Sequence, residues 1–193
     1  MVLSKNTAVQ LLEMLHQGAS NSREVTAAFA DAIEANDPKI RSFVRWDKES
    51  ALQTAENIDV ARDAGENIGP LGGLPVAIKD VLCTTDDVTS CGSKMLAEYR
   101  SPYDATVVRR LKEAGAVLIG KTNMDEFGMG STTESSAYAP TANPWDDLHI
   151  KQITASGNIL RTSPKTGVQD IGATGNTWNN VYTDNVGTGT NLG

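Results

Sequence analysis

Two lysines follow short apolar runs, a position where catalytic and binding side chains are often found. Lys79 and Asp80 follow residues 76–78, and a second lysine opens the polar segment 121–126 after residues 116–119. Ligands of α/β proteins bind beyond the carboxyl ends of the strands, so both positions are candidates for a site. Burial there lowers the pKa of a lysine and can leave a neutral amine that acts as a base.

A lysine at a strand end also has a structural interpretation. Its ammonium group can reach solvent at the end of an extended side chain, or it can pair with a neighbouring carboxylate. For Lys79 that neighbour would be Asp80. Spacing by itself favours the structural role, because most lysines at strand ends take no part in chemistry.

Apolar periodicity and capping residues predict four amphipathic helices around these segments. Their approximate ranges are 7–17, 21–35, 47–64 and 104–114. The second helix opens at Asn21, which with Glu24 resembles a capping box, and it is expected to end at residues 36–38, where Pro38 stands. All four helices are expected to cover a core.

The fourth helix lies between the two apolar runs. We expect Val107, Val108 and Leu111 to face inward and Gly115 to end the helix. The continuous apolar run 116–119 is typical of a strand that is buried on both faces. A strand, a crossover helix and a second strand predict a parallel pair with a right-handed connection. The predicted fold class is therefore α/β.

The overall composition is that of a soluble protein. Hydrophobic residues make up 39% of the 193 positions and charged residues 21%. No run approaches the roughly 18–20 apolar residues that span a bilayer, and the polar N-terminus lacks the apolar core of a secretory signal. We therefore expect a cytoplasmic location and no membrane contact. The net charge of −7 argues against direct binding to nucleic acid.

The cysteines and histidines do not form a metal-binding pattern. Cys83 and Cys91 are the two cysteines, and His16 and His149 lie far from both in the sequence. These spacings do not match a zinc site, so no metal is expected. Two reduced, partly buried thiols are the expected state of a cytosolic protein.

Three segments that include both lysines resemble the amidase-signature family. They are residues 71–80 (LGGLPVAIKD), 104–116 (DATVVRRLKEAGA) and 120–131 (GKTNMDEFGMGS). Residues 133–135 (TES) and 143–146 (NPWD) extend the match, which is most similar to the amidase subunit of the glutamyl/aspartyl-tRNA amidotransferases. The resemblance implies the N-terminal portion of the amidase-signature fold, with helices around a mixed, partly parallel sheet.

The resemblance implies a serine amidase with a Ser–cis-Ser–Lys triad. One serine attacks the side-chain amide of glutamine, and a second serine bridges it to the lysine, which takes the proton and returns it to the leaving ammonia. The matching lysine is Lys79, with Asp80 as a supporting neighbour. Four residues, whose glycines would let the backbone approach a ligand closely, are implied to border the substrate pocket: Gly128, Met129, Gly130 and Ser131.

The family also implies a wider reaction. The ammonia would serve the transamidation of misacylated Glu-tRNA(Gln) or Asp-tRNA(Asn). ATP is implied for the complete complex and no cofactor for this chain. Partner subunits of the amidotransferase would hold the tRNA, so that this chain makes no direct contact with nucleic acid.

The resemblance stops near Asp146. In the family, NPWD is followed by a Gly/Ser-rich stretch with the bridging serine, and then by the nucleophile. Here residues 147–154 read DLHIKQIT, and Ser156-Gly157 is the nearest serine–glycine pair. One triad member of three is present, so we expect no hydrolysis by this chain alone. The truncated fold is also expected to leave a sheet edge and apolar surface exposed.

The composition divides the chain into residues 1–146, the amidase-signature fragment, and residues 147–193, an unrelated tail. The first part carries the whole net charge, whereas 21 of the 47 tail residues are Gly, Thr or Asn. Residues 170–182 (DIGATGNTWNNVY) resemble a motif of phage tail-fibre and related β-rich trimeric proteins. A disordered linker explains this composition equally well.

Two other functions stay open from the sequence. The chain could belong to another amidase-signature hydrolase that acts on small amides, because the residues that select the substrate are missing. It could also be a structural phage or fibre-associated fusion protein in which the amidase-like part is a passenger.

Overall fold

A computed structural model describes residues 2–144, which contain four α-helices and a three-stranded sheet. The helices are α1 (Ala8–His16), α2 (Ser22–Ile40), α3 (Lys48–Asp63) and α4 (Thr106–Glu113). The strands are β1 (Phe43–Trp46), β2 (Pro75–Lys79) and β3 (Val117–Thr122), and short 3-10 helices span Leu3–Lys5, Lys94–Leu96 and Glu126–Gly128. None of the described helices is long and apolar enough to cross a membrane. The tail, residues 147–193, lies outside the described residues, so the boundary at Asp146 stays a prediction.

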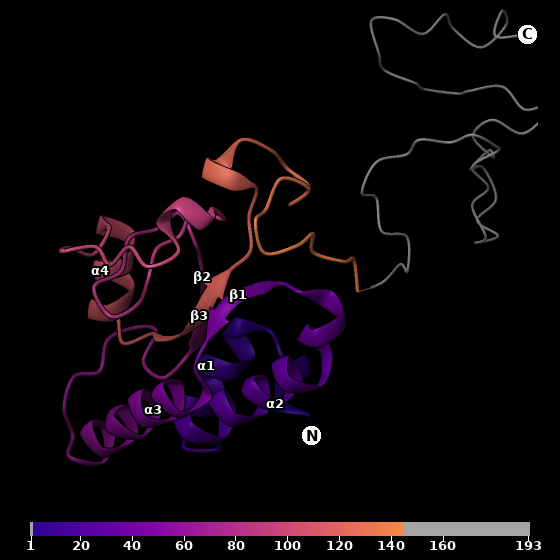
Figure 1. Ribbon diagram of the computed structural model, residues 1–193. Coiled ribbons are helices and arrows are strands. Elements are labelled where there is room, and N and C mark those ends of the chain that lie inside the picture. Colours follow the sequence, from indigo (N-terminus) through magenta and orange to yellow (C-terminus); the bar gives the residue numbers. More distant parts are fainter. Residues whose placement is uncertain (1, 145–193) are drawn as a thin grey trace, which may run out of the picture. The chain divides into compact units, whose positions relative to one another are not determined.

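The sheet is mixed, as expected, with the strand order β1-β3-β2. β2 and β3 are parallel and are connected through α4, which confirms the predicted strand–helix–strand unit. β1 pairs antiparallel with the second half of β3. Figure 1 shows α1, α2 and α3 on one side of the sheet and α4 on the other, so that the fold is a layered α/β unit.

Two groups of buried apolar residues join the first three helices to the sheet. Leu11, Leu15 and Val25 of the helices pack with Leu74 next to β2. Ala51 and Ala55 of α3 pack with Val117 and Ile119 of β3. Phe29 of α2 contacts both groups, which makes the two clusters one continuous layer. The three predicted N-terminal helices are thus confirmed as the cover of one sheet face.

The expected end of the second helix is wrong, because α2 continues through Pro38 to Ile40. A proline within a helix removes one i→i−4 hydrogen bond, and α2 continues for only two residues beyond Pro38. The helix ends instead at Arg41, in the left-handed conformation with φ 57°, whose N–H donates to Asp37 O at 2.7 Å. The Asp37 carboxylate then accepts from Ser42 N at 2.7 Å, which fixes the turn into β1.

The start of α2 has half of the expected capping box. Asn21 Oδ1 accepts from Glu24 N at 2.7 Å, but the Glu24 carboxylate accepts from Ser20 Oγ instead of the Asn21 N–H. A second carboxylate completes the cap from α3. Asp59 accepts from the backbone N–H groups of Ser22 and Arg23 at 2.8 and 2.9 Å. Four N–H groups are unsatisfied at the start of a helix, and α3 therefore supplies part of the cap for α2.

α4 turns one of its two adjacent valines inward. Val108 is fully buried, whereas Val107 is 45% exposed, so the prediction that both face inward is wrong for Val107. Successive helical residues point about 100° apart, and a single contact face therefore cannot hold both. Gly115 ends the helix as expected, with a positive φ of 84°.

Two features of the sheet were not expected from the sequence. β1 was not predicted, and β3 extends to Thr122 instead of ending near Ile119. The extension is the part of β3 that pairs with β1, with Trp46 opposite Gly120 and Phe43 opposite Thr122. Lys121 is therefore a residue within a strand and does not follow one.

Gly115→Ala should destabilise the fold far more than Gly18→Ala, although both glycines have a positive φ. A Cβ on Gly115 would lie 1.9 Å from Ile68 O, whereas one on Gly18 has no atom within 4 Å. We expect a loss of about 3 kcal/mol or more for Gly115→Ala, measured by urea unfolding. Gly18→Ala should lower the free energy of unfolding by about 1–2 kcal/mol, which is the cost of a left-handed backbone conformation alone. Equal losses for the two variants would contradict the steric explanation.

Candidate active site

Lys79 is the last residue of β2 and its side chain is exposed. It lies beside Thr122, the last residue of β3, so both strands end at the same edge of the sheet. The prediction that Lys79 stands at the carboxyl end of a strand is confirmed. Among residues 2–144 no ion pair and no hydrogen bond from a serine reaches the Lys79 amine. The amine is therefore presented to solvent.

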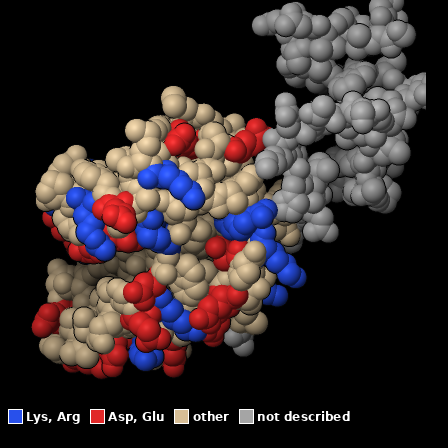
Figure 2. Space-filling view, viewed as in Figure 1, with Lys and Arg blue, Asp and Glu red and all other residues tan. Residues whose placement is uncertain are grey.

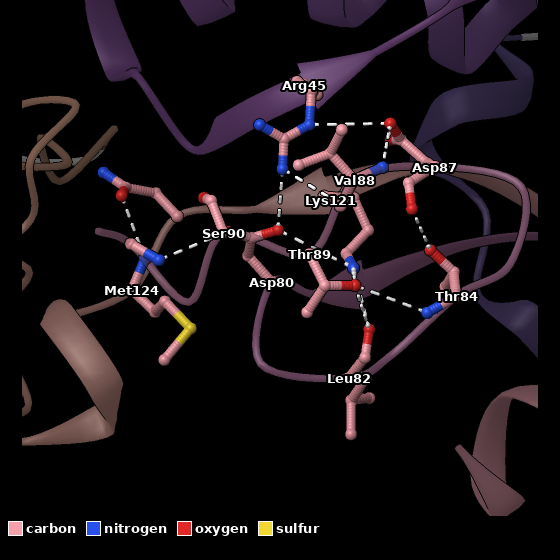
Figure 3. A network of polar contacts seen from close by, with 12 residues as sticks. Arg45, Asp80, Leu82, Thr84, Asp87, Val88, Thr89, Ser90, Lys121 and Met124 are labelled. Atoms are coloured by element: carbon pink, nitrogen blue, oxygen red, sulfur yellow. Dashed lines mark hydrogen bonds and ion pairs between the residues drawn. The ribbon is translucent and has the colours of Figure 1, made fainter. Parts of the chain in front are cut away.

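Asp80, the next residue, is fully buried and is the centre of a polar network (Figure 3). Arg45 Nη2 of β1 donates to Asp80 Oδ1 at 3.0 Å. Ser90 Oγ and the Gly92 N–H donate to Asp80 Oδ2, the N–H at 3.2 Å. A buried carboxylate is costly unless charges and hydrogen bonds compensate for lost water. The carboxylate is thus committed to these partners and does not pair with Lys79.

Lys121 of β3 faces the same carboxylate and is buried, with 2% of its surface exposed. Its Nζ donates to Leu82 O at 2.7 Å and to Thr89 Oγ1 at 3.1 Å, and lies 3.6 Å from Asp80 Oδ1. Burial lowers the pKa of Lys121 below its ordinary value, although the Asp80 charge opposes the shift. Burial of a lysine, with the lowered pKa that follows from it, is therefore found at Lys121. Lys79 is exposed to solvent instead.

A short loop connects the Asp80 network to the segment that follows β3. The Cys91 N–H donates to Asp80 O at 3.3 Å, and the Phe127 N–H donates to Cys91 O at 2.8 Å. Cys91 and Gly92 both have positive φ, at 53° and 67°. Ser93 Oγ adds a bond of 2.5 Å to Glu126. These bonds hold the ends of β2 and β3 and the following loop in one arrangement.

The implied pocket residues lie on a loop that a second buried carboxylate organises. Asp125 is 5% exposed and accepts from the N–H groups of Thr132, Thr133 and Ser135 at 3.0, 2.8 and 3.1 Å. The Ser135 and Thr133 bonds lower the pKa of Asp125 below its ordinary value. The loop therefore folds around the Asp125 carboxylate. Its exposed members include the four implied pocket residues: Gly128, Met129, Gly130 and Ser131.

Gly130 is required by this carboxylate. A Cβ at Gly130 would lie 2.4 Å from Asp125 Cγ. Gly128 has a positive φ of 75° but has open space around it, with Met124 Cε at 3.8 Å as the nearest atom. The resemblance implied that these glycines let the backbone approach a ligand, and for Gly130 the structure shows an approach to Asp125 instead.

Sequence reasoning missed the supporting residues of this site. Arg45 gave no signal, because its partner Asp80 lies 35 residues away and β1 itself was not predicted. Asp125 lies within the motif 120–131, but the motif alone assigned it no role. An aspartate followed within five residues by Gly128 and Gly130 was the signal that could have identified it, because aspartate side chains often accept from nearby backbone N–H groups.

Cys83 and Cys91 are free and half-buried, as expected. Within residues 2–144 no group of three or more His, Cys, Asp or Glu side chains could hold a metal ion. The exposed amine of Lys79 is a reactive group that the described site offers.

A cavity of about 660 Å³ lies between α3, β3 and the segment before α4. Figure 2 shows the surface hollowed between the α4 side and the α3 side. Two of its cations are paired, because Arg45 contacts Asp80 and Asp87, and Lys112 contacts Asp86 and Asp104. The lining includes Arg45 and Lys121 of the Asp80 network but neither Lys79 nor the implied pocket loop.

Asp80→Ala should cost about 3–5 kcal/mol of unfolding free energy, because it leaves Arg45 and buried Lys121 without their shared carboxylate. Asp86→Ala is the matched control. It also removes an ion pair, with Lys112, but its side chain is 72% exposed, so the expected loss is about 0–1 kcal/mol. Urea unfolding of both variants measures the difference. A loss below about 1 kcal/mol for Asp80→Ala would exclude a central role for the network.

Acid should loosen the loop around Asp125 before the helices unfold. The pKa of Asp125 in the folded chain is below its ordinary value of 3.8. The unfolded state therefore binds more protons in this window, and the stabilisation is complete above the ordinary value and is lost as the pH falls through the folded pKa. Amide exchange of Thr133, followed by NMR from pH 6 downward, measures this. Asp125→Asn should show fast exchange already at pH 6, and unchanged exchange would disprove the role.

Comparison with known proteins identifies the family of this site. A family model described as Amidase matches residues 24–151. A glutamyl-tRNA(Gln) amidotransferase subunit of Moorella thermoacetica is 54% identical over 153 residues, which are 79% of this chain and 31% of that protein. The chain thus spans about a third of the length of the curated relatives that it matches.

Solved structures share the same unit. A glutamyl-tRNA(Gln) amidotransferase subunit from Thermotoga maritima is 36% identical with a TM-score of 0.57, over 75% of this chain and 28% of that one. Native peptide amidase from Stenotrophomonas maltophilia is 34% identical with a TM-score of 0.64, over 72% of this chain and 29% of that one. The family match covers most of the chain, including β2, which carries Lys79, and its neighbour β3, and the chain belongs to the Amidase family.

Proposed function

We propose that this chain contributes the catalytic lysine to an active site that hydrolyses glutamine, as in the amidotransferases. The observation that carries the proposal is the exposed Lys79 amine at the carboxyl end of β2. It lies within a segment 54% identical to a glutamyl-tRNA(Gln) amidotransferase subunit. In the complete enzyme the ammonia would serve the amidation of misacylated tRNA.

Lys79 is the catalytic residue that this chain contributes. As one serine attacks the glutamine amide, its proton passes through a bridging serine to the Lys79 amine, which later returns the proton to the departing ammonia. The acyl-enzyme bond forms on the serine, which the chain itself does not provide at a matching position. A base without its nucleophile has no covalent route, because triad members act as a unit.

The buried network acts on Lys79 through the backbone. Asp80 holds the end of β2 against β1 and β3, through Arg45 and Lys121. Proton transfer requires a donor–acceptor distance of roughly 3 Å, so a strand end that moves would lose catalytic contact. Asp80 and Lys121 are therefore positioning residues.

The loop of Gly128, Met129, Gly130 and Ser131 borders the pocket in this proposal. Its residues are exposed, and Asp125 fixes its backbone from the buried side. Substrate selection requires further walls, which the remaining two thirds of the relatives' length would provide. ATP, the partner subunits and tRNA likewise belong to the complete complex, and no residue of this chain is assigned to them.

A second candidate is a hydrolase of other amides. The supporting observation is the similarity to the peptide amidase, whose TM-score of 0.64 exceeds the 0.57 of the Thermotoga maritima protein. The higher sequence identity to the curated amidotransferase relatives favours the first candidate. Both share the role of Lys79.

The chain by itself should release no ammonia from glutamine above the blank without protein, and Lys79→Met should not change this result. The reason is the missing serine nucleophile. A coupled ammonia assay measures it over several hours. Release that disappears in Lys79→Met would show that a serine of this chain had been recruited, and the expectation of inactivity would be wrong.

A chimera tests the role of Lys79 directly. The matched N-terminal third of the Moorella thermoacetica relative is replaced by residues 1–146 of this chain, and glutamine hydrolysis is assayed with the partner subunits. We expect activity, and a loss of about a thousandfold or more in Lys79→Met. Lys94→Met, at another exposed lysine, should retain full activity. Equal activity in the two variants would reject Lys79 as the base.

A further inference from the structure

The cavity beside the Asp80 network has the size and the walls of a small-molecule site. Its volume of about 660 Å³ lies within the roughly 300–1,000 Å³ of known ligand pockets. It is hollowed into the surface between the α3 side and the α4 side (Figure 2). Half-buried Trp46, Ile58 and Leu118 form apolar parts of its wall. These side chains offer an apolar surface to the body of a ligand.

Two arginines line this cavity from segments that meet at one residue. Arg45 belongs to β1, and Arg100 lies in the segment before α4. The Arg100 backbone forms an isolated antiparallel bridge with Val88. Arg45 Nη2 donates to Val88 O at 3.0 Å. Because both arginines are tied to Val88 and both reach the cavity, their guanidinium groups share one space.

Both guanidinium groups keep N–H donors that no protein atom uses. Nη2 of Arg45 is bonded within the polar network, but Nε is buried without a hydrogen bond, 3.5 Å from Asp87 Oδ1. Figure 3 shows the remaining nitrogen, Nη1, on the side away from Asp87. Within residues 2–144, Arg100 makes one side-chain bond, from Nη1 to Asp86 O at 3.4 Å, and no ion pair. A guanidinium has five donors, so several remain for a ligand.

The charges of the lining favour an anion. Four cationic and three acidic residues line the cavity. Each acid already has a partner: Asp47 caps α3, Asp86 contacts Lys112 and Asp87 contacts Arg45. The cation without a carboxylate partner in the described part of the chain is Arg100. A planar guanidinium fits a carboxylate with two parallel hydrogen bonds, so a carboxylate is the group that this wall would recognise.

We propose that this cavity binds a small organic carboxylate with an aromatic body. The carboxylate accepts from Arg100 and from the unused donors of Arg45, and the body lies against Trp46 and Leu118. Arg45 keeps its bond to Asp80 through Nη2. The site does not include Lys79, so it is independent of the proposed glutamine hydrolysis.

A pair of probes that differ in charge tests the site on the full chain. The probes are 2-naphthoate and the uncharged 2-naphthalenemethanol, titrated at neutral pH and followed by NMR. We expect saturable binding of the naphthoate with a dissociation constant of about 0.1–1 mM. The alcohol should bind about tenfold more weakly or worse, because it cannot accept charge-assisted bonds. The Arg45 Nε–H and the Trp46 indole N–H should shift with the naphthoate. Equal binding of the two probes, or no saturation up to about 10 mM naphthoate, would overturn the proposal.

Arg100→Gln isolates the charge of the site. Its single long side-chain bond makes little contribution to folding, so the variant should fold as the parent chain does. We expect about tenfold weaker binding of naphthoate and unchanged binding of the alcohol. The matched control is Arg110→Gln, at an exposed arginine of α4 that does not line the cavity, and it should bind both probes normally. Equal affinity of the two variants for naphthoate would contradict recognition by Arg100.

A filled cavity tests the location independently of charge. Thr54 of α3 is exposed and lines the cavity, so Thr54→Trp should fold and abolish binding of both probes. Gln53→Trp, at the adjacent exposed position outside the lining, should leave binding unchanged. Binding that survives Thr54→Trp would place the ligand elsewhere and overturn the proposal. None of these measurements depends on ammonia release, so an inactive Lys79 and an empty cavity are separate results.

Discussion

The buried carboxylate of Asp80 is the interaction on which the ends of all three strands depend. It receives Arg45 from β1, Ser90 and Gly92 from the following loop, and faces Lys121 of β3. Burying one charge among apolar residues would be strongly unfavourable, and here two cations and two neutral donors share the cost. The arrangement is geometric as well as electrostatic, because the partners come from three segments: β1, β3 and the loop that follows β2. The residue before Asp80 is consequently held in place without any contact to its own side chain.

Other carboxylates act in the same way elsewhere in the chain. Asp37 binds the turn after α2, Asp59 caps the start of α2 from α3, and Asp125 gathers the N–H groups of the pocket loop. Asp104 accepts from the Thr85 N–H at 2.7 Å. Charge-assisted bonds to backbone N–H groups are stronger than neutral ones. Part of the acidic excess of residues 1–146 is therefore structural, and a net negative charge need not describe a surface adapted to a cationic partner.

The helices were predictable from the sequence because their signals are local. Leu11 and Leu15 repeat at helical spacing and are both buried, and the same holds for Ala51 and Ala55 of α3. β1 escaped prediction because four residues give little periodicity, and its partner strand lies about 75 residues further along the chain. Residues 43–46 form a strand because their backbone groups pair with β3, and a pairing with a distant segment leaves no local pattern in the sequence.

The same limit applies to the two lysines. Sequence placed Lys79 correctly at a strand end, and the family motif marked it, but neither showed which lysine would be buried. Burial of Lys121 depends on β1 extending the sheet over it and on Asp80 lying within 3.6 Å. Burial thus marks Lys121, the supporting residue, whereas exposed Lys79 is the lysine that matches the family's catalytic position.

The exposed side chain of Lys79 belongs to a strand that has one neighbour within residues 2–144. In a parallel sheet a strand that carries a functional residue is normally flanked on both sides, since its backbone groups and its neighbours must be shielded from water. β2 is flanked on one side within the described residues, and the side chain of Lys79 is exposed. Whatever segment satisfies the edge also forms a wall beside the amine. Completing the sheet and completing the active site are, for this strand, the same structural event.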